Sequence, residues 1–131
     1  MNDLSECTVL IVDDAETNID ILLDILGEEC DVTVAMDGES ALEAVDEEHP
    51  DLILLDIMMP GMDGYDVCKR LKDNPATAHI PVVFLTALTE DEEKKRGLEM
   101  GALDYITKPF EVSEIQSKVQ KYLTETIAGS N

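Results

Sequence analysis

The sequence predicts a doubly wound α/β fold, in which helices cover both faces of one parallel sheet. Five short apolar runs recur along the chain, at residues 8–12, 32–35, 52–55, 82–86 and 105–107. Several of them are continuous and β-branched, as expected for strands that are covered on both faces. Longer segments with helical spacing separate the runs, and this strict alternation favours parallel strands joined by right-handed crossovers.

The first half of the chain contains two predicted helices. After the strand at 8–12, apolar residues fall at helical positions i, i+3, i+4 and i+7, namely Ile19, Leu22, Leu23 and Leu26. Gly27 is expected to end this helix. After the strand at 32–35, a second helix is expected behind Asp37 and Gly38, with the apolar positions Ala41, Leu42 and Val45.

The second half of the chain repeats the pattern three times. After the strand at 52–55, a third helix is indicated by Tyr65, Cys68, Lys69 and Leu71. The strand at 82–86 precedes a fourth helix that Leu98 closes. The strand at 105–107 precedes a fifth helix, marked by Ile115, Val119 and Tyr122. Residues 127–131 are expected to form a frayed tail.

The composition limits the possible functions. A chain of 131 residues fits one domain, spanning 1–131, and a hydrophobic fraction of 44% suffices for a buried core. Thirty acidic residues against nine basic ones give a net charge of −21, which opposes general binding to nucleic acids or anionic membranes. Residues 1–68 contain 20 acids and no base, so an acidic face is expected mainly in the first half.

The cysteines and the hydropathy bear on the cellular compartment. Cys7, Cys30 and Cys68 are odd in number and widely spaced, which favours reduced thiols in an intracellular protein. The sequence has neither an apolar run long enough to span a bilayer nor a charged-then-apolar leader. A cytoplasmic location is therefore expected.

Polar residues follow four of the five predicted strands. They are Asp13 and Asp14, Asp56, Thr86 and Lys108. In a doubly wound sheet, ligands bind beyond the carboxyl ends of the strands. Three neighbouring acids repel one another, and oxygen ligands without Cys or His suit a hard divalent cation, of which Mg²⁺ is the first choice.

Each of these residues also has an ordinary structural explanation. The adjacent aspartates can form a turn or cap a helix, and Asp56 can do the same. Thr86 is compatible with a simple strand position, and Lys108 with a solvated side chain. The combination at matched strand ends is harder to attribute to chance, so a common site is the favoured hypothesis.

Four sequence motifs extend this hypothesis. They are Asp13-Asp14, LLDIMMPGMDG at 54–64, FLTA at 84–87 and DYITKPF at 104–110. In this order they resemble the receiver domain of two-component response regulators, over about residues 8–123. The resemblance implies a flavodoxin-like α/β fold with five parallel strands in the order 2-1-3-4-5, flanked by five helices.

The resemblance also implies how the acidic residues act. Asp56 would be the phosphoacceptor, a carboxylate nucleophile that becomes an aspartyl phosphate. Asp14 and Asp56 would bind Mg²⁺ directly and Asp13 mainly through water. The backbone carbonyl of Met58 would be a further ligand.

Three more residues receive roles from the resemblance. Lys108 and Thr86 would contact the phosphoryl oxygens, and the bond between Lys108 and Pro109 would be cis. Tyr105 matches the switch aromatic: phosphorylation would draw Thr86 inward, and the Tyr105 ring would fill the vacated space. On the residues alone, Tyr105 can also be a half-exposed strand aromatic.

The implied partners are a sensor histidine kinase or a histidine phosphotransfer protein. An output domain or a second receiver is expected at the fourth helix, fifth strand and fifth helix. The phosphohistidine donor is expected to dock at the first helix, where acids lie beside the apolar row of Ile19, Leu22 and Leu23. Direct contact with nucleic acids or membranes is not expected.

Two other functional classes are less favoured. An aspartyl-phosphate phosphohydrolase needs a second aspartate two positions after the nucleophile, and that position is Met58 here. A degenerate receiver that only binds proteins is disfavoured because all the catalytic positions of the motifs are present. The expected domain is not a conventional enzyme, since a receiver catalyses only its own phosphorylation and dephosphorylation.

Overall fold

The computed structural model describes residues 6–87, 95–96 and 98–129, with the side chains of 127–129 left out. Strands and helices alternate from the start of the chain, as the apolar pattern predicts. The elements are β1 (Thr8–Val12), α1 (Glu16–Leu26), β2 (Asp31–Ala35), α2 (Gly38–Glu47), β3 (Leu52–Asp56), α3 (Gly64–Asp73), β4 (Val82–Thr86), β5 (Asp104–Thr107) and α5 (Val112–Gly129).

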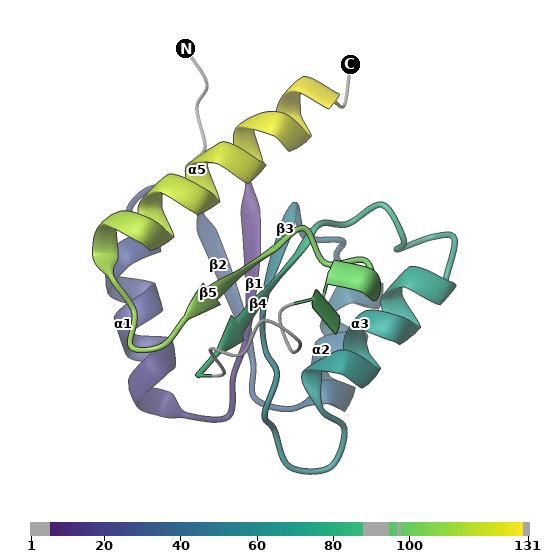
Figure 1. The fold of residues 1–131 in the computed structure, drawn as a ribbon. Coiled ribbons are helices and arrows are strands. Elements are labelled where there is room, and N and C mark those ends of the chain that lie inside the picture. Colours follow the sequence, from purple (N-terminus) through teal and green to yellow (C-terminus); the bar gives the residue numbers. More distant parts are fainter. Residues whose placement is uncertain (1–5, 88–94, 97, 130–131) are drawn as a thin grey trace.

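The five strands form one parallel sheet in the order β2-β1-β3-β4-β5. Helices α1 and α5 cover one face of the sheet, and α2 and α3 cover the other (Figure 1). The predicted doubly wound fold and strand order are therefore confirmed. Strand β2 lies at one edge of the sheet, next to β1 alone.

The predicted fourth helix falls largely on residues 88–94 and 97, which lie outside the described part of the chain. The described residues nearest to it, Lys95, Arg96, Leu98 and Glu99, are helical. Four helices with defined bounds are thus present in the described residues, where the sequence predicts five.

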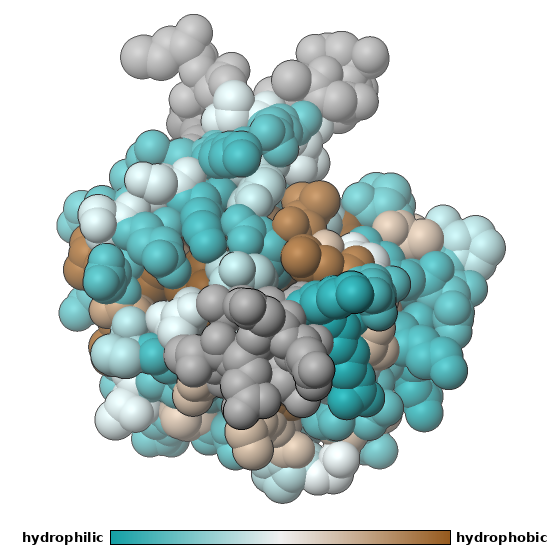
Figure 2. Space-filling view, in the orientation of Figure 1, coloured by the Kyte–Doolittle hydropathy of each residue, from teal (hydrophilic) through white to brown (hydrophobic). Residues whose placement is uncertain are grey.

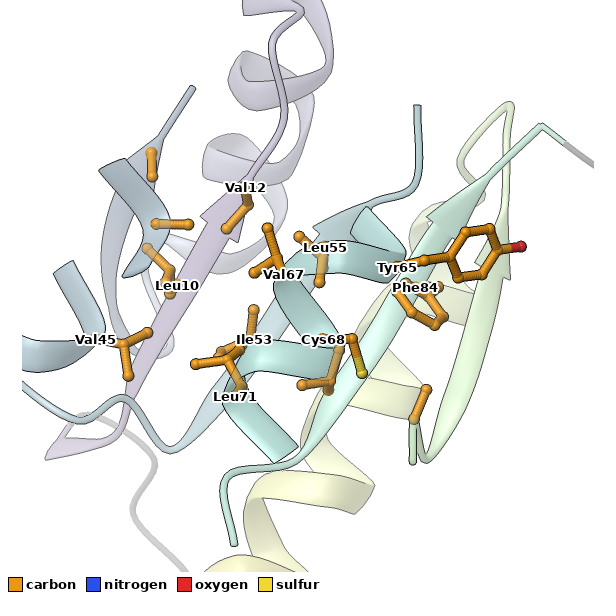
Figure 3. Close-up of a cluster of buried hydrophobic side chains, with 14 of the residues drawn as sticks. Leu10, Val12, Val45, Ile53, Leu55, Tyr65, Val67, Cys68, Leu71 and Phe84 are labelled. Atoms are coloured by element: carbon orange, nitrogen blue, oxygen red, sulfur yellow. The ribbon is translucent and has the colours of Figure 1, made fainter. Parts of the chain in front are cut away.

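The core has two halves, one on each face of the sheet. On the α2/α3 face, Phe84 of β4 packs edge to face against Tyr65 of α3, with the ring centroids 5.4 Å apart, and Figure 3 shows this cluster. Every residue of β3 and β4 is buried, which explains why their sequences are continuous apolar runs. Each fully buried Leu, Ile or Phe contributes roughly 1.5 to 3 kcal/mol through removal of apolar surface from water.

The start of α2 and the start of α3 are fixed by aspartates. Asp37 accepts a hydrogen bond from the Ser40 backbone N–H at 2.7 Å, and Asp63 forms a reciprocal capping box with Asp66. The end of α1 differs in detail from expectation. Gly27 follows the helix, but its φ of −62° is ordinary helical geometry, so the left-handed freedom of glycine is not used there.

The exposed surface of α1 differs from the sequence prediction. Ile19 and Leu22 are buried against the sheet, so two residues of the expected docking row belong to the core. The exposed apolar residues of this helix are Ile21 and Leu23, at 44% and 36% exposure. Helical periodicity identifies the apolar face of a helix. It does not show which apolar side chains at the border of that face stay exposed when the helix packs against the sheet.

Helix α5 continues through residues 127–129 of the segment that the sequence predicts to be a frayed tail. Residues 130–131 lie outside the described part. Over the described ranges, no helix is both long and apolar enough to cross a membrane. The face seen in Figure 2 is mostly hydrophilic, as the large excess of acidic residues leads one to expect.

Candidate functional site

The carboxyl ends of the strands meet at one edge of the sheet, the lower edge in Figure 1. Asp13 follows β1, Asp56 ends β3, and Asp14 lies next to Asp13. One carboxylate oxygen from each of these three residues lies within 4.8 Å of the others. Asp13 and Asp56 are buried and Asp14 is exposed. The fold therefore brings together the three acids that the sequence predicts.

Asp13 is held by the first turn of the following helix. Its Oδ1 accepts the backbone N–H of Ala15 at 2.9 Å, and its Oδ2 accepts the side-chain amide of Asn18 at 3.2 Å. The sequence reading missed Asn18. The signal available was its place in the first turn of α1, where a side chain can reach back to the end of the preceding strand.

Lys108 supplies a positive charge to the acidic cluster. Its Nζ lies 3.1 Å from Asp56 Oδ1 and 3.6 Å from Asp13 Oδ2. Its backbone N–H donates to the carbonyl of Thr86 at 2.7 Å, which ties the end of β5 to the end of β4. The bond between Lys108 and Pro109 is cis, as expected.

The pKa of Asp56 is raised from 3.8 to about 6. Burial is the main cause, because it disfavours the charged carboxylate, and the nearby charge of Asp13 acts in the same direction. The hydrogen bond and positive charge of Lys108, with the backbone N–H of Met58, act in the opposite direction. The interactions with Lys108 and Met58 thus offset only part of the unfavourable effect of burial on ionised Asp56.

Two glycines shape the loop between β3 and α3. Gly61 has a φ of +77°, a left-handed conformation that side chains rarely adopt. Gly64 lies so close to the end of β3 that a Cβ atom there would be 2.4 Å from the Asp56 carbonyl oxygen. Its N–H donates to the carbonyl of Ile57 at 2.8 Å. The loop therefore packs directly against the backbone of Asp56.

The other predicted residues lie at or near this edge. Thr86 is buried at the end of β4. The Met58 N–H donates to Asp56 Oδ1 at 3.3 Å, while its side chain is 68% exposed. Tyr105 lies further from the acids: it is paired with Phe84 in the sheet, and its carbonyl accepts the Lys118 ammonium at 2.7 Å.

The donor set fits a hard divalent cation. Three carboxylates lie close together, and two of them are buried. Among the described residues, Lys108 is the cation that forms ion pairs with Asp13 and Asp56. Oxygen ligands of this kind suit Mg²⁺, which tolerates few protein ligands and keeps several waters. A divalent ion would balance the negative charge that Lys108 leaves uncompensated.

A family model described as "Response regulator receiver domain" matches residues 9–120. The chain belongs to this family. As a receiver domain, it is not a conventional enzyme. The acidic pocket of Asp13, Asp14 and Asp56 is the phosphorylation pocket of a two-component response regulator receiver.

Individual relatives agree with this assignment. Response regulator PleD from Caulobacter vibrioides is 50% identical over 104 residues, which are 79% of this receiver and 23% of PleD. A "Probable cyclic di-GMP phosphodiesterase" from Vibrio cholerae is 44% identical over 123 residues, which are 94% of this receiver and 28% of that protein. The receiver thus spans about a quarter of each of these two relatives.

A solved structure supports the fold independently. The receiver domain of Francisella response regulator 1452 superposes on this receiver with a TM-score of 0.85 and 34% identity. The match covers 92% of this chain and 99% of that chain.

Proposed function

We propose that Asp56 accepts a phosphoryl group from a phosphohistidine and that the receiver then changes conformation to signal to a partner. The observation that carries this proposal is the place of Asp56: a buried carboxylate at the sheet edge, in contact with the Lys108 ammonium and close to two further aspartates. A nucleophile so placed has cationic help for an incoming anion and little competition from bulk water.

The chemical step is a displacement at phosphorus. A carboxylate oxygen of Asp56 forms a bond to phosphorus as the P–N bond to the donor histidine breaks, and the imidazole leaves with a proton. Lys108, already 3.1 Å from Asp56, pairs with the transferred phosphoryl oxygens. The backbone N–H of Met58 is a further donor beside the reacting carboxylate.

Mg²⁺ would be held by Asp13, Asp14, Asp56 and the backbone carbonyl of Met58, and it would supply charge neutralisation for the phosphoryl oxygens. Asn18 and the N–H of Ala15 keep the Asp13 carboxylate oriented toward the pocket. Orientation by such surrounding hydrogen bonds is the usual way in which metal ligands are positioned. Mutation of Asn18 would therefore weaken the site without removing a ligand.

Thr86 and Tyr105 would read the phosphorylation state. Thr86 is buried at the end of β4 and moves toward the phosphoryl group. Tyr105, on the neighbouring strand and partly buried, then fills the vacated space. This exchange would alter the surface of β5, α5 and the segment between β4 and β5, where an output domain or a second receiver would bind.

A sensor histidine kinase or a histidine phosphotransfer protein is the proposed donor, and the cytoplasm is the proposed location. The exposed Ile21 and Leu23, with the exposed acids Asp20 and Asp24, give α1 a mixed apolar and negative surface for such a partner. A donor with a basic rim would be steered to this surface. We do not propose direct binding to nucleic acids or membranes.

The first experiment tests phosphoryl acceptance. With Mg²⁺ and acetyl phosphate, the wild type should gain one acid-stable, base-labile phosphoryl group, measured by intact mass. Asp56→Asn should gain none, because an amide is not a comparable nucleophile. Asp14→Asn should gain the group slowly, since it loses one proposed metal ligand. Equal labelling of wild type and Asp56→Asn would refute the assignment.

Magnesium should raise the melting temperature of the wild type by several degrees, because the ion binds the folded site and relieves repulsion among the carboxylates. Asp14→Ala should lose most of this response, and Asp14 is exposed, so the fold should tolerate the change. Asp20→Ala removes a comparable negative charge outside the site and should keep the full response. Differential scanning fluorimetry with and without Mg²⁺ measures the shift, and an unchanged shift in Asp14→Ala would place the ion elsewhere.

The phosphorylated state should be long-lived. Hydrolysis needs a water in line with phosphorus, and the exposed side chain of Met58 beside Asp56 cannot orient one by strong hydrogen bonds. Leu88, the second apolar position expected to influence this water, lies outside the described residues. The double variant Met58→Asn, Leu88→Gln should lose phosphate several-fold faster, measured by the decay of intact mass. Met58→Leu is the control and should decay at the wild-type rate; a double variant no faster than this control would contradict the prediction.

A further inference from the structure

Two of the three cysteines are neighbours in the sheet. Thr8 and Asp31 are paired in the register of β1 and β2, and the N–H of Asp31 donates to the carbonyl of Cys7 at 2.9 Å. Cys7 and Cys30 each immediately precede one member of that pair. Adjacent strands lie about 4.8 Å apart, which is within the range of Cα separations that a disulfide spans.

The two side chains also share one face of the sheet. Alternation along β1 places Cys7 on the same face as Val9, and alternation along β2 places Cys30 on the same face as Val32. Both cysteines belong to the core cluster beneath α1 and α5, with 5% and 6% exposure. Both side chains therefore lie in the same apolar layer, on one face of the sheet.

We propose that Cys7 and Cys30 are a redox-sensitive thiol pair that closes to an intramolecular disulfide under oxidising conditions. With hydrogen peroxide as oxidant, one thiolate attacks a peroxide oxygen and becomes a sulfenic acid, with release of hydroxide. The sulfur of the second thiol then displaces this oxygen as water and forms the S–S bond. Overall, two thiols and one peroxide give one disulfide and two waters, and a dithiol reductant reverses the change.

The disulfide would close a covalent loop over residues 7–30, which contains α1 and the two adjacent aspartates. The bridge lies at the amino ends of the strands, at the opposite edge of the sheet from Asp56. Its main effect is therefore on the stability of the unit formed by β1, α1 and β2 rather than on the reacting groups. Cross-linking removes conformational freedom from the unfolded chain and so favours the folded one.

The environment of the pair makes its oxidation slow. Burial, with the neighbouring Cys7, Glu29 and Asp31, raises the pKa of the Cys30 thiol to about 11. The thiol also donates to the carbonyl of Leu26 across 3.6 Å. Since the thiolate is the reactive form, the pair should respond to sustained oxidation and ignore brief exposure.

Cys68 provides a matched control. It is buried like the other two, but it lies in the cluster on the α2/α3 face, where Figure 3 labels it. The sheet thus separates its thiol from Cys7 and Cys30. The closure of a disulfide should not depend on Cys68.

The test is to incubate the folded protein with hydrogen peroxide or diamide and to measure intact mass and alkylation by iodoacetamide after unfolding. Wild type and Cys68→Ser should lose two hydrogen atoms and two alkylatable thiols, whereas Cys7→Ser and Cys30→Ser should form no intramolecular disulfide. Residues 1–68 contain no Lys or Arg, so trypsin leaves all three cysteines in one peptide. A protease that cleaves at acidic residues is therefore needed to map the pairing.

Identification of the disulfide-linked peptides in the oxidised wild type shows which cysteines are paired, even where a serine variant does not fold. Oxidation of the urea-unfolded chain should give all three pairings, while the folded protein should give Cys7 with Cys30 alone. The oxidised protein should melt several degrees higher than the reduced one, with reversal by dithiothreitol. A disulfide to Cys68, intermolecular disulfides alone, no reaction, or the same mixture in the folded and unfolded states would overturn the proposal.

Discussion

Asp56→Asn should be more stable than the wild type in magnesium-free buffer at pH 8, by about 1 to 3 kcal/mol in the free energy of unfolding. The pKa of Asp56 is raised from 3.8 to about 6 in the folded protein, mainly by burial. At pH 8 the folded wild type must hold this carboxylate ionised in an unfavourable place. Asparagine has nearly the same shape and carries no charge, so it avoids this cost. Loss of the pairing with Lys108 offsets part of the gain.

The sign of this effect depends on pH. Because the folded state binds the Asp56 proton more tightly than the unfolded state, the contribution of protonated Asp56 is fully present below about pH 4. It is lost as the pH rises through about 6. The advantage of the variant should therefore grow from near zero at pH 4 to its full size above pH 7.

Urea unfolding at several pH values measures this difference. Asp20→Asn, at an exposed acid outside the site, is the control and should show no comparable pH dependence. Saturating Mg²⁺ should reduce the advantage of Asp56→Asn, because the ion stabilises the ionised wild type. A variant that is less stable than the wild type at pH 8 without Mg²⁺ would contradict the assigned environment of Asp56.

Gly64→Ala should destabilise the protein by about 2 to 4 kcal/mol and impair phosphoryl uptake by Asp56. The new Cβ would lie 2.4 Å from the Asp56 carbonyl oxygen and 2.8 Å from the Ile57 Cα. Both atoms belong to the backbone at the end of β3, so α3 or the strand must move. Either movement displaces the carboxylate from its contact with Lys108.

Gly61→Ala is a control that separates the steric clash at position 64 from the general effect of replacing a loop glycine. Gly61 has the left-handed φ of +77°, but no described atom lies within 4 Å of the position of its Cβ. The expected cost is only the backbone strain, roughly 1 to 2 kcal/mol, with phosphoryl uptake preserved. Urea unfolding and acetyl phosphate labelling of both variants measure the two effects. Equal losses in the two variants would show that close packing at Gly64 is not the cause.

The sequence was sufficient to predict the centre of the fold. Strands β3 and β4 are buried on both faces, so their apolar runs are continuous and their bounds differ from the prediction by at most one residue. The place of the site could be predicted from the same pattern. The carboxyl ends of parallel strands lie at one edge of the sheet, so residues that follow the strands, such as Asp13, Asp56 and Lys108, meet there.

Other features depend on relations that a single sequence does not contain. Asp13 and Asp14 are adjacent and chemically identical, yet one is buried and the other exposed, since consecutive residues point in different directions. The exposed flank of α1 depends on how far its neighbours extend over it. The proximity of Cys7 and Cys30 depends on the register of β1 against β2, and apolar spacing within each strand does not report that register.

The pairing of Asp56 with Lys108 joins residues that are 52 positions apart in the chain. In the sheet order, β3 and β5 are not neighbours, and β4 must lie between them. On a ribosome, the segments up to β3 emerge well before Lys108 does, so the nascent chain passes through a stage that has the acids without their cation. Long-range strand pairing is also a slow part of folding. Because Lys108 belongs to the proposed phosphorylation site, phosphoryl uptake is expected only after β4 and β5 have joined the sheet.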